Sequence, residues 1–74
     1  MRIRIYTKQE LAMLYFPKAL PHTAVNHLMR WINRCGPLKE ALREANYRNR
    51  NRLFTPRQTG LIFRFLGEPD DSVH

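Results

Sequence analysis

The stretch Pro21–Arg34, PHTAVNHLMRWINR, has the spacing of an amphipathic helix, and the rest of the chain is organised around it. An α-helix turns by about 100° per residue, so residues three and four apart share a face. One face requires a core to pack against, and the opposite face carries cations and amides of the kind that bind phosphates and base edges. The apolar stripe contains Val25, Leu28, Met29 and Ile32, whereas the polar face contains His27, Arg30 and Arg34, with Asn26 beside them.

The length and composition predict one small packed domain. The chain has 74 residues, of which 43% are hydrophobic and 11% aromatic, so it lies near the lower size limit for a self-supporting core. Its single cysteine, Cys35, excludes an internal disulfide and fits a reducing compartment. The N-terminal residues have no apolar signal segment, and no run approaches the roughly 18 apolar residues of a membrane span. We therefore expect a cytoplasmic protein with no membrane partner.

The distribution of charge favours a polyanionic partner. The formal net charge is +7, and three of the six acids, Glu68, Asp70 and Asp71, lie in the last seven residues. Residues 1–67 therefore hold thirteen basic residues against three acidic ones, which gives +10. A basic domain of this kind is typical of proteins that bind nucleic acid, although some small ribosomal and metabolic proteins are equally basic.

The residues before the central helix carry their own boundary signals. Residues 2–6 alternate in polarity with period two, which predicts a short strand with one buried face. Thr7 and Glu10 have the spacing of a capping box and predict the start of a helix. That helix is predicted to end at Phe16, because Pro17 disfavours helical geometry in the residue before it.

The residues after the central helix predict a third helix and a hairpin. Gly36 is predicted to take a left-handed cap, and Pro37 to open a helix that ends at a left-handed Asn46. The segment Tyr47–Phe54 has no helical period and alternates arginine with other residues. It predicts a basic β-hairpin that turns near Arg50.

The C-terminal part predicts one more helix and a tail. Thr55 and Gln58 have capping-box spacing, and Gly67 is predicted to close the helix that they begin. Residues 1–67 are predicted to form the single domain, and residues 68–74 a flexible acidic tail. The predicted core consists of Ile3, Ile5, Leu11, Leu14, Val25, Leu28, Met29, Ile32, Leu38, Leu42, Ile62, Phe65 and Leu66.

The order strand, helix, helix, helix, hairpin, helix predicts a mainly α fold, a small winged helix-turn-helix-like domain with a short N-terminal strand and a basic β-hairpin. The sequence resembles the MerR and phage-excisionase superfamily of winged helix-turn-helix domains. Its T-x-x-E-L-A stretch is matched by Thr7, Glu10, Leu11 and Ala12, and its wing stretch by Asn46, Tyr47, Arg48, Phe54 and Thr55. The resemblance implies a DNA-binding function of the transcription-regulator or excisionase type.

A second resemblance covers nearly the whole chain. Through ELAMLYFP, AVNHLMRWI, FTPRQ and FLGEP the sequence is similar to a family of short Bacteroidales proteins, the domain of unknown function numbered 4248. This resemblance implies no particular activity. The functional expectations therefore rest on the residues and on the superfamily resemblance.

Double-stranded DNA is the expected partner. In a helix-turn-helix the N-terminal half of the second helix contacts base edges, while arginine and asparagine bind guanine and adenine through paired hydrogen bonds. A solvated basic surface is the alternative for the same residues. The expected base-contacting residues are Thr23, Asn26, His27 and Arg30, and the expected backbone-contacting residues are Arg34, Arg48, Arg50 and Arg52. Arg2, Arg4, Lys8 and Arg57 are candidates for extending this surface.

Trp31 lies at the margin of the apolar stripe of the central helix. It is predicted to pack in the core, beneath the hairpin or the third helix. A dimer contact and base stacking are the alternatives for this side chain.

The residue pattern argues against an enzyme. His22 and His27 face different sides of the helix with no third ligand at helical spacing, so no metal site is expected. The sequence has neither an evident acid–base pair nor a glycine-rich phosphate loop, and we expect no cofactor and no small-molecule substrate. The alternatives to DNA binding are an adaptor that docks an acidic protein partner, RNA binding, mimicry of a winged helix against a host protein, and a homodimer.

Overall fold

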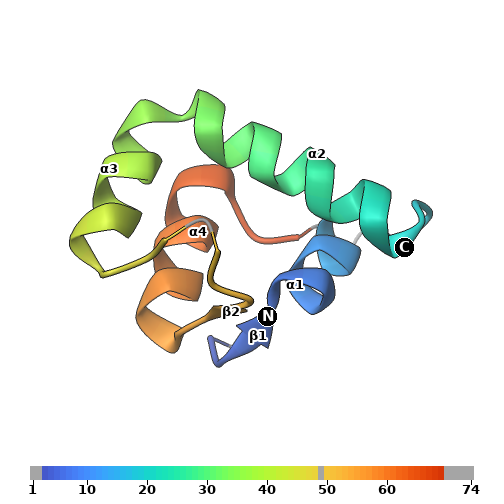
Figure 1. Cartoon of the computed structure of the whole chain (residues 1–74), viewed down its shortest axis with the longest axis horizontal. Helices are drawn as coiled ribbons and strands as arrows, with labels where there is room; N and C mark the ends of the chain where they lie inside the picture. Colours follow the sequence, from blue (N-terminus) through green and yellow to red (C-terminus); the bar gives the residue numbers. More distant parts are fainter. Residues whose placement is uncertain (1–2, 49, 70–74) are drawn as a thin grey trace.

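The computed structural model describes residues 3–48 and 50–69, which form four helices joined to a small two-stranded sheet. In Figure 1, α2 runs across the top of the molecule, α1 lies beneath one end of it, and α3 folds back from the other end. None of the described helices has the length and apolar content that a membrane crossing requires. The elements are β1 (Tyr6–Thr7), α1 (Lys8–Tyr15), α2 (Pro21–Arg34), α3 (Gly36–Glu44), β2 (Leu53–Phe54) and α4 (Pro56–Leu66).

Two capping boxes fix the starts of α1 and α4, as the sequence predicts. The Thr7 hydroxyl accepts a hydrogen bond from the Glu10 backbone N–H, and the Glu10 carboxylate accepts one from the Thr7 N–H, each at 2.9 Å. Thr55 and Gln58 repeat this exchange at 3.2 and 3.0 Å. Each box satisfies two N–H groups that a helix start leaves without a partner.

The junction between α2 and α3 differs from the prediction. α2 has the predicted bounds, but Gly36 is the first residue of α3 and takes no left-handed cap. The chain turns instead at Cys35, which is extended and whose N–H donates to the carbonyls of Trp31 and Ile32. One extended residue is therefore enough to redirect the helix. The left-handed residue predicted at Asn46 is confirmed, with φ of 68°.

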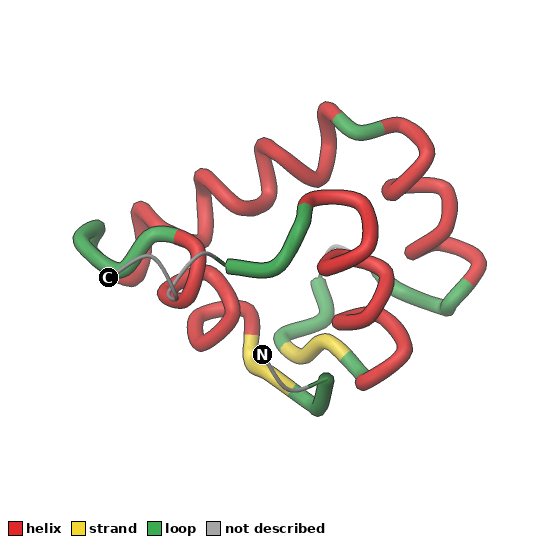
Figure 2. The backbone as a smooth tube through the Cα atoms, turned by 180° about the vertical axis from the view of Figure 1, so that it is seen from behind, coloured by secondary structure: helices red, strands yellow, loops and turns green. Residues whose placement is uncertain are grey.

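The hairpin predicted within residues 47–54 is wrong for the part of it that the structure describes. β2 pairs with β1 in antiparallel register, with Tyr6 opposite Phe54 and Thr7 opposite Leu53, and Figure 2 shows these strands side by side. Within residues 3–7 the structure has a strand at Tyr6–Thr7, so β1 begins later than the strand predicted for residues 2–6. Arg2 lies outside the described residues. Alternation in sequence cannot reveal a partner that is nearly fifty residues away.

The core contains buried side chains from all four helices and both strands, and it differs from the prediction near the chain ends. Ile3, Ile5 and Phe65 were predicted to be buried, but they are 57%, 53% and 41% exposed, whereas Tyr6 and Phe63 are buried. The pairing of β1 with β2 turns Tyr6 inward against the Phe63 ring, which reverses the predicted parity of the strand. The fully buried side chains include Leu11, Leu28, Ile32, Leu38, Leu42, Phe54 and Ile62.

Candidate nucleic-acid interface

One edge of α2 is closed by aromatic rings. The Trp31 ring packs edge-to-face on Phe16 and Tyr15, with centroid distances of 4.8 and 6.2 Å, and the His27 ring lies 5.3 Å from Phe16. We call these four residues the aromatic edge. The prediction that Trp31 packs beneath the hairpin or the third helix is wrong, because it lies against the end of α1 and remains 42% exposed. His27 is half-buried here, so only part of its ring faces solvent.

The opposite edge of α2 contacts the segment that follows α3. We call residues 47–52 the basic loop; Asn49 lies outside the described residues. The Tyr47 hydroxyl donates to the thioether sulfur of Met29 at 3.7 Å, and Val25 and Arg52 line one shallow hollow of about 410 Å³. Val25 and Met29 therefore form the loop edge of α2.

The outer surface of α2, between these two edges, carries three of the four predicted base-contacting residues, and also Arg34, which is predicted to contact the DNA backbone. Thr23, Asn26, Arg30 and Arg34 are all exposed. The Asn26 amide nitrogen lies 3.4 Å from Nε2 of His22, within hydrogen-bonding distance. These four exposed side chains therefore share the outer surface of α2, whereas the His27 ring packs on Phe16 at the margin of that surface.

The basic loop is an irregular turn that presents its arginines to solvent. Arg48, Arg50 and Arg52 are exposed, and the Asn51 N–H donates to the carbonyl of Arg48 at 2.9 Å. The carbonyl of Arg52 accepts a hydrogen bond from the Lys8 N–H, also at 2.9 Å, so the loop is tied to the start of α1. The loop that carries the predicted arginines therefore lies beside α2 at its two ends, Tyr47 and Arg52, without a hairpin.

Tyr47 anchors the start of the basic loop. Its ring stacks on Phe54, with centroids 5.1 Å apart and an interplanar angle of 25°, and the Lys8 ammonium lies 5.2 Å from the centroid of the Tyr47 ring. Burial raises the pKa of Tyr47 to about 12, and burial lowers the pKa of Lys8. The phenol therefore stays protonated at neutral pH and can act as a hydrogen-bond donor.

The predicted interface arginines have no acidic partners among the residues that the structure describes. Arg30, Arg34, Arg48, Arg50 and Arg52 make no ion pair there, whereas Arg43 is paired with Glu40. Guanidinium groups without carboxylate partners remain available to phosphates.

Of the residues proposed to extend this surface, two lie at the sheet and on α4. The Arg4 guanidinium carbon lies 4.1 Å from the centroid of the Tyr6 ring, and Arg57 is exposed at the start of α4. Arg2 lies outside the described residues. Within residues 3–48 and 50–69 no three His, Cys, Asp or Glu side chains come together in a way that could hold a metal ion.

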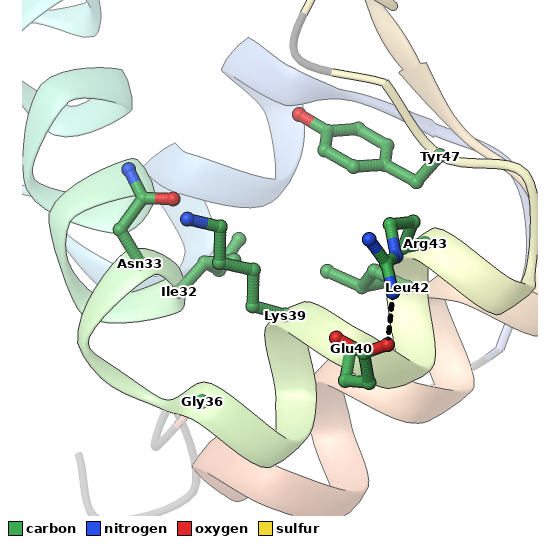
Figure 3. A pocket seen from close by; sticks show the side chains of 8 residues that line it. All are labelled: Ile32, Asn33, Gly36, Lys39, Glu40, Leu42, Arg43 and Tyr47. Carbon is green, nitrogen blue, oxygen red and sulfur yellow. Dashed lines mark hydrogen bonds and ion pairs between the residues drawn. The ribbon is translucent and has the colours of Figure 1, made fainter.

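A second hollow, of about 520 Å³, lies where α2 turns into α3. We call it the elbow hollow. Its floor is apolar, because Ile32 and Leu42 lie there, and Tyr47 closes one wall. Figure 3 shows the polar side chains around it, which come from Asn33, Lys39, Glu40 and Arg43.

The sequence prediction did not include any of these polar residues. Asn33 follows Asn26 by seven residues, about two helical turns, so both occupy the same side of α2. That repeat is the signal from which Asn33 could have been found. Lys39 and Arg43 give no such signal, because their position depends on the turn at Cys35.

Comparisons with other proteins identify the family of the chain but no characterised relative. Neither the curated proteins nor the solved structures contain a match. A family model described as "Domain of unknown function (DUF4248)" matches residues 2–69 of the 74. Because that match spans more than nine-tenths of the sequence, the chain belongs to the DUF4248 family.

Proposed function

We propose that this protein binds double-stranded DNA through the outer surface of α2 and the basic loop. The observation that carries the proposal is the placement of five arginines without acidic partners among the described residues. Two of them, Arg30 and Arg34, lie on α2, and the other three lie in a loop whose Tyr47 is bonded to Met29 and whose Arg52 lines a hollow with Val25. Counter-ion release from DNA gives such a surface its affinity.

The two parts of this surface have different roles in the proposal. Thr23, Asn26 and Arg30 contact base edges in the major groove, and His27 contributes from the margin of the same surface. Arg34 and the loop arginines contact backbone phosphates, which position the helix. This division agrees with the sequence resemblance to MerR and excisionase domains, in which a second helix enters the groove.

The salt dependence of binding tests the proposal directly. If five to seven cations contact phosphates, the logarithm of the association constant falls against the logarithm of salt concentration with a slope of about −4 to −6. Fluorescence anisotropy with a labelled duplex at several salt concentrations measures this slope. A slope near zero would exclude duplex DNA as the partner.

Three single substitutions separate the roles. Arg50→Ala should lower affinity by a similar factor for every duplex, whereas Arg30→Ala should also reduce the preference between duplexes. Arg64→Ala is the matched control, since this exposed arginine lies on α4, outside the proposed surface. Equal behaviour of all three variants would show that the surface has been assigned incorrectly.

An adaptor that docks a protein partner is the second candidate, and the exposed part of the aromatic edge favours it. Trp31 is 42% exposed and Leu20, just before α2, is 74% exposed, so large apolar side chains in and next to α2 are available for a protein contact. For an adaptor, Trp31→Ala should abolish partner binding while random duplex DNA fails to bind the parent protein at low salt. Tight DNA binding by the Trp31→Ala variant would favour the first function instead.

A further inference from the structure

We propose that the elbow hollow is a phosphate-binding subsite that holds one backbone phosphate of the bound DNA. The inference rests on the proposed function for the source of the phosphate. Its residues, however, are not among the DNA-contacting residues named above, although Tyr47 begins the basic loop. A hollow of about 520 Å³ is ample for a phosphate group and the sugar carbons beside it.

Three side chains around the hollow supply the donors that a phosphate needs. In Figure 3 the oxygen of the Asn33 side-chain amide faces the Lys39 ammonium, and the Tyr47 hydroxyl is directed toward the same side. Rotation of the Asn33 amide by half a turn would bring its NH₂ group to the mouth as a donor. Tyr47 is hydrogen-bonded only to the Met29 sulfur, a weak acceptor at 3.7 Å, among the described residues. The hydroxyl can therefore turn to a stronger acceptor without the loss of a strong bond.

The charges around the hollow determine whether it favours an anion or a cation. Arg43 is neutralised by its pairing with Glu40, so among the described residues that line the hollow Lys39 carries the charge without a carboxylate partner. Glu40 lies on the same rim, and its carboxylate cancels the charge of Arg43, which would otherwise attract an anion. The hollow is therefore weakly cationic, and its affinity for phosphate is held down by one carboxylate.

The shape of the hollow favours a compact anion over a planar ring. One face of Tyr47 stacks on Phe54, and the Lys8 ammonium also lies over the ring. Since the ring is packed in this way, a nucleobase cannot stack on it without displacing a neighbour. What the hollow offers is donors at its mouth and apolar contacts for sugar carbons on its floor.

The position of the hollow matches the course of a DNA strand along α2. Asn26 and Asn33 lie on the same side of the helix, about 10.5 Å apart along its axis. Phosphates of one strand recur about every 3.4 Å along the duplex axis, so a strand whose bases face Asn26 can place a phosphate about three nucleotides further along near Asn33. The subsite would hold the C-terminal end of α2, where no base contacts are proposed, against the DNA backbone.

Neutralising Lys39 tests the subsite against a matched control. Lys39→Gln should reduce the magnitude of the salt slope by about 0.9, and affinity near 0.1 M salt should fall by about eightfold, the change expected for one lost phosphate contact. Lys18→Gln removes the same charge from the connector between α1 and α2 and should leave the slope unchanged. Lys39→Arg should restore the slope. Both lysines are exposed, so thermal unfolding should match the parent.

Glu40→Gln gives a test of the opposite sign. The substitution removes the carboxylate and frees Arg43, so DNA should bind more tightly and the salt slope should become steeper. A solvated surface with no phosphate in the hollow would show the same slope as the parent. Unchanged slopes in both Lys39→Gln and Glu40→Gln, with the parent still binding DNA, would overturn the subsite and leave the proposed function standing.

A titration with inorganic phosphate tests the subsite independently of DNA binding. Titration of the parent with phosphate, against chloride at equal ionic strength, should shift the NMR signals of the Asn33 side-chain amide, and Lys39→Gln should abolish the shift. If DNA does not bind at all, this shift still supports a phosphate site that takes a free phosphate. No shift in a protein that also fails to bind DNA would overturn both proposals.

Discussion

The two edges of α2 are built from different interactions. At the aromatic edge, Trp31 and His27 pack on the rings at the end of α1. At the loop edge, Met29 receives one weak hydrogen bond from Tyr47, and the neighbouring residues are cationic. Ring packing buries area and stabilises the fold, whereas a lightly held cationic loop contributes little stability and keeps its charges in solvent. One helix therefore divides stability and charge between its two sides.

Truncating a residue on the buried face of α2 should have the largest effect. Leu28 is fully buried, and Leu28→Ala should destabilise the fold by about 2–5 kcal/mol through lost burial and the resulting cavity. Urea unfolding followed by circular dichroism measures the change. For a chain this small the loss should come close to the whole free energy of unfolding, and a change below about 1 kcal/mol would mean that α2 is not central to the core.

Truncating the aromatic edge should have the next largest effect. Trp31→Ala removes two edge-to-face contacts from a partly exposed side chain, so the expected loss is about 1–3 kcal/mol. DNA affinity, measured where the variant is folded, should stay within about twofold of the parent, because none of the proposed DNA-contacting side chains but His27 lies there. A larger fall in affinity than in stability would assign DNA contacts to this edge.

At alkaline pH, Tyr47 at the loop edge should ionise before Tyr15 at the aromatic edge, and each ionisation should lower the stability of the fold. Burial raises the pKa of Tyr47 to about 12, and burial together with the Glu68 carboxylate raises the pKa of Tyr15 still further from the ordinary 10.0. Above about pH 10 the unfolded chain loses these protons while the folded chain keeps them. The stability that they contribute is thus complete below pH 10 and is lost as pH rises toward 12.

For each such tyrosine the free energy of unfolding should fall by up to about 1.4 kcal/mol per pH unit in that window. Unfolding curves of the parent, Tyr47→Phe and Tyr15→Phe over this range measure the slopes, and each variant should have a shallower one. Because Tyr47 has the lower folded-state pKa, phenolate absorbance should report ionisation at the loop edge first. Ionisation of Tyr15 before Tyr47 would contradict the expected order of the two edges.

Removing a loop arginine should have the smallest effect on stability. Arg48→Ala and Arg50→Ala change exposed side chains without acidic partners among the described residues, so each should alter the free energy of unfolding by less than about 0.5 kcal/mol. The same variants should weaken DNA binding. If instead they destabilise the fold as much as Trp31→Ala, the loop edge is a structural contact and the division between the edges fails.

The elements with local signals were predictable from the sequence. Thr7 and Thr55 mark helix starts through partners three residues away, and the bounds of α2 follow from its period and from Pro21. Asn46 marks a helix end because few residues tolerate a positive φ. In each case the determining contacts lie within about one helical turn.

The sequence did not predict the pairing of the strands, the junction between α2 and α3 or the position of the loop. Leu53 and Phe54 pair with β1 across the chain, and nothing in their alternation identifies that partner. Gly36 was expected to cap α2, but the extended Cys35 already turns the chain, so the glycine joins the next helix. For the interface, the arginines were predictable from charge, whereas their position beside Val25 and Met29 depends on tertiary packing. DNA as the partner stays a prediction.

Gln58 holds the base of the basic loop closed. Its side-chain nitrogen donates to the carbonyl of Ala45 at 2.8 Å inside the core, while its oxygen accepts from the Thr55 N–H. The residues before and after the loop are thereby fastened to each other, and the loop between them is not needed to keep them together. Doubling the length of such a loop costs only about 0.6 kcal/mol. The residues between the buried Tyr47 and Arg52, whose carbonyl is bonded to Lys8, can therefore be lengthened, shortened or replaced while the frame stays intact, so the charged surface can change on one unchanged scaffold.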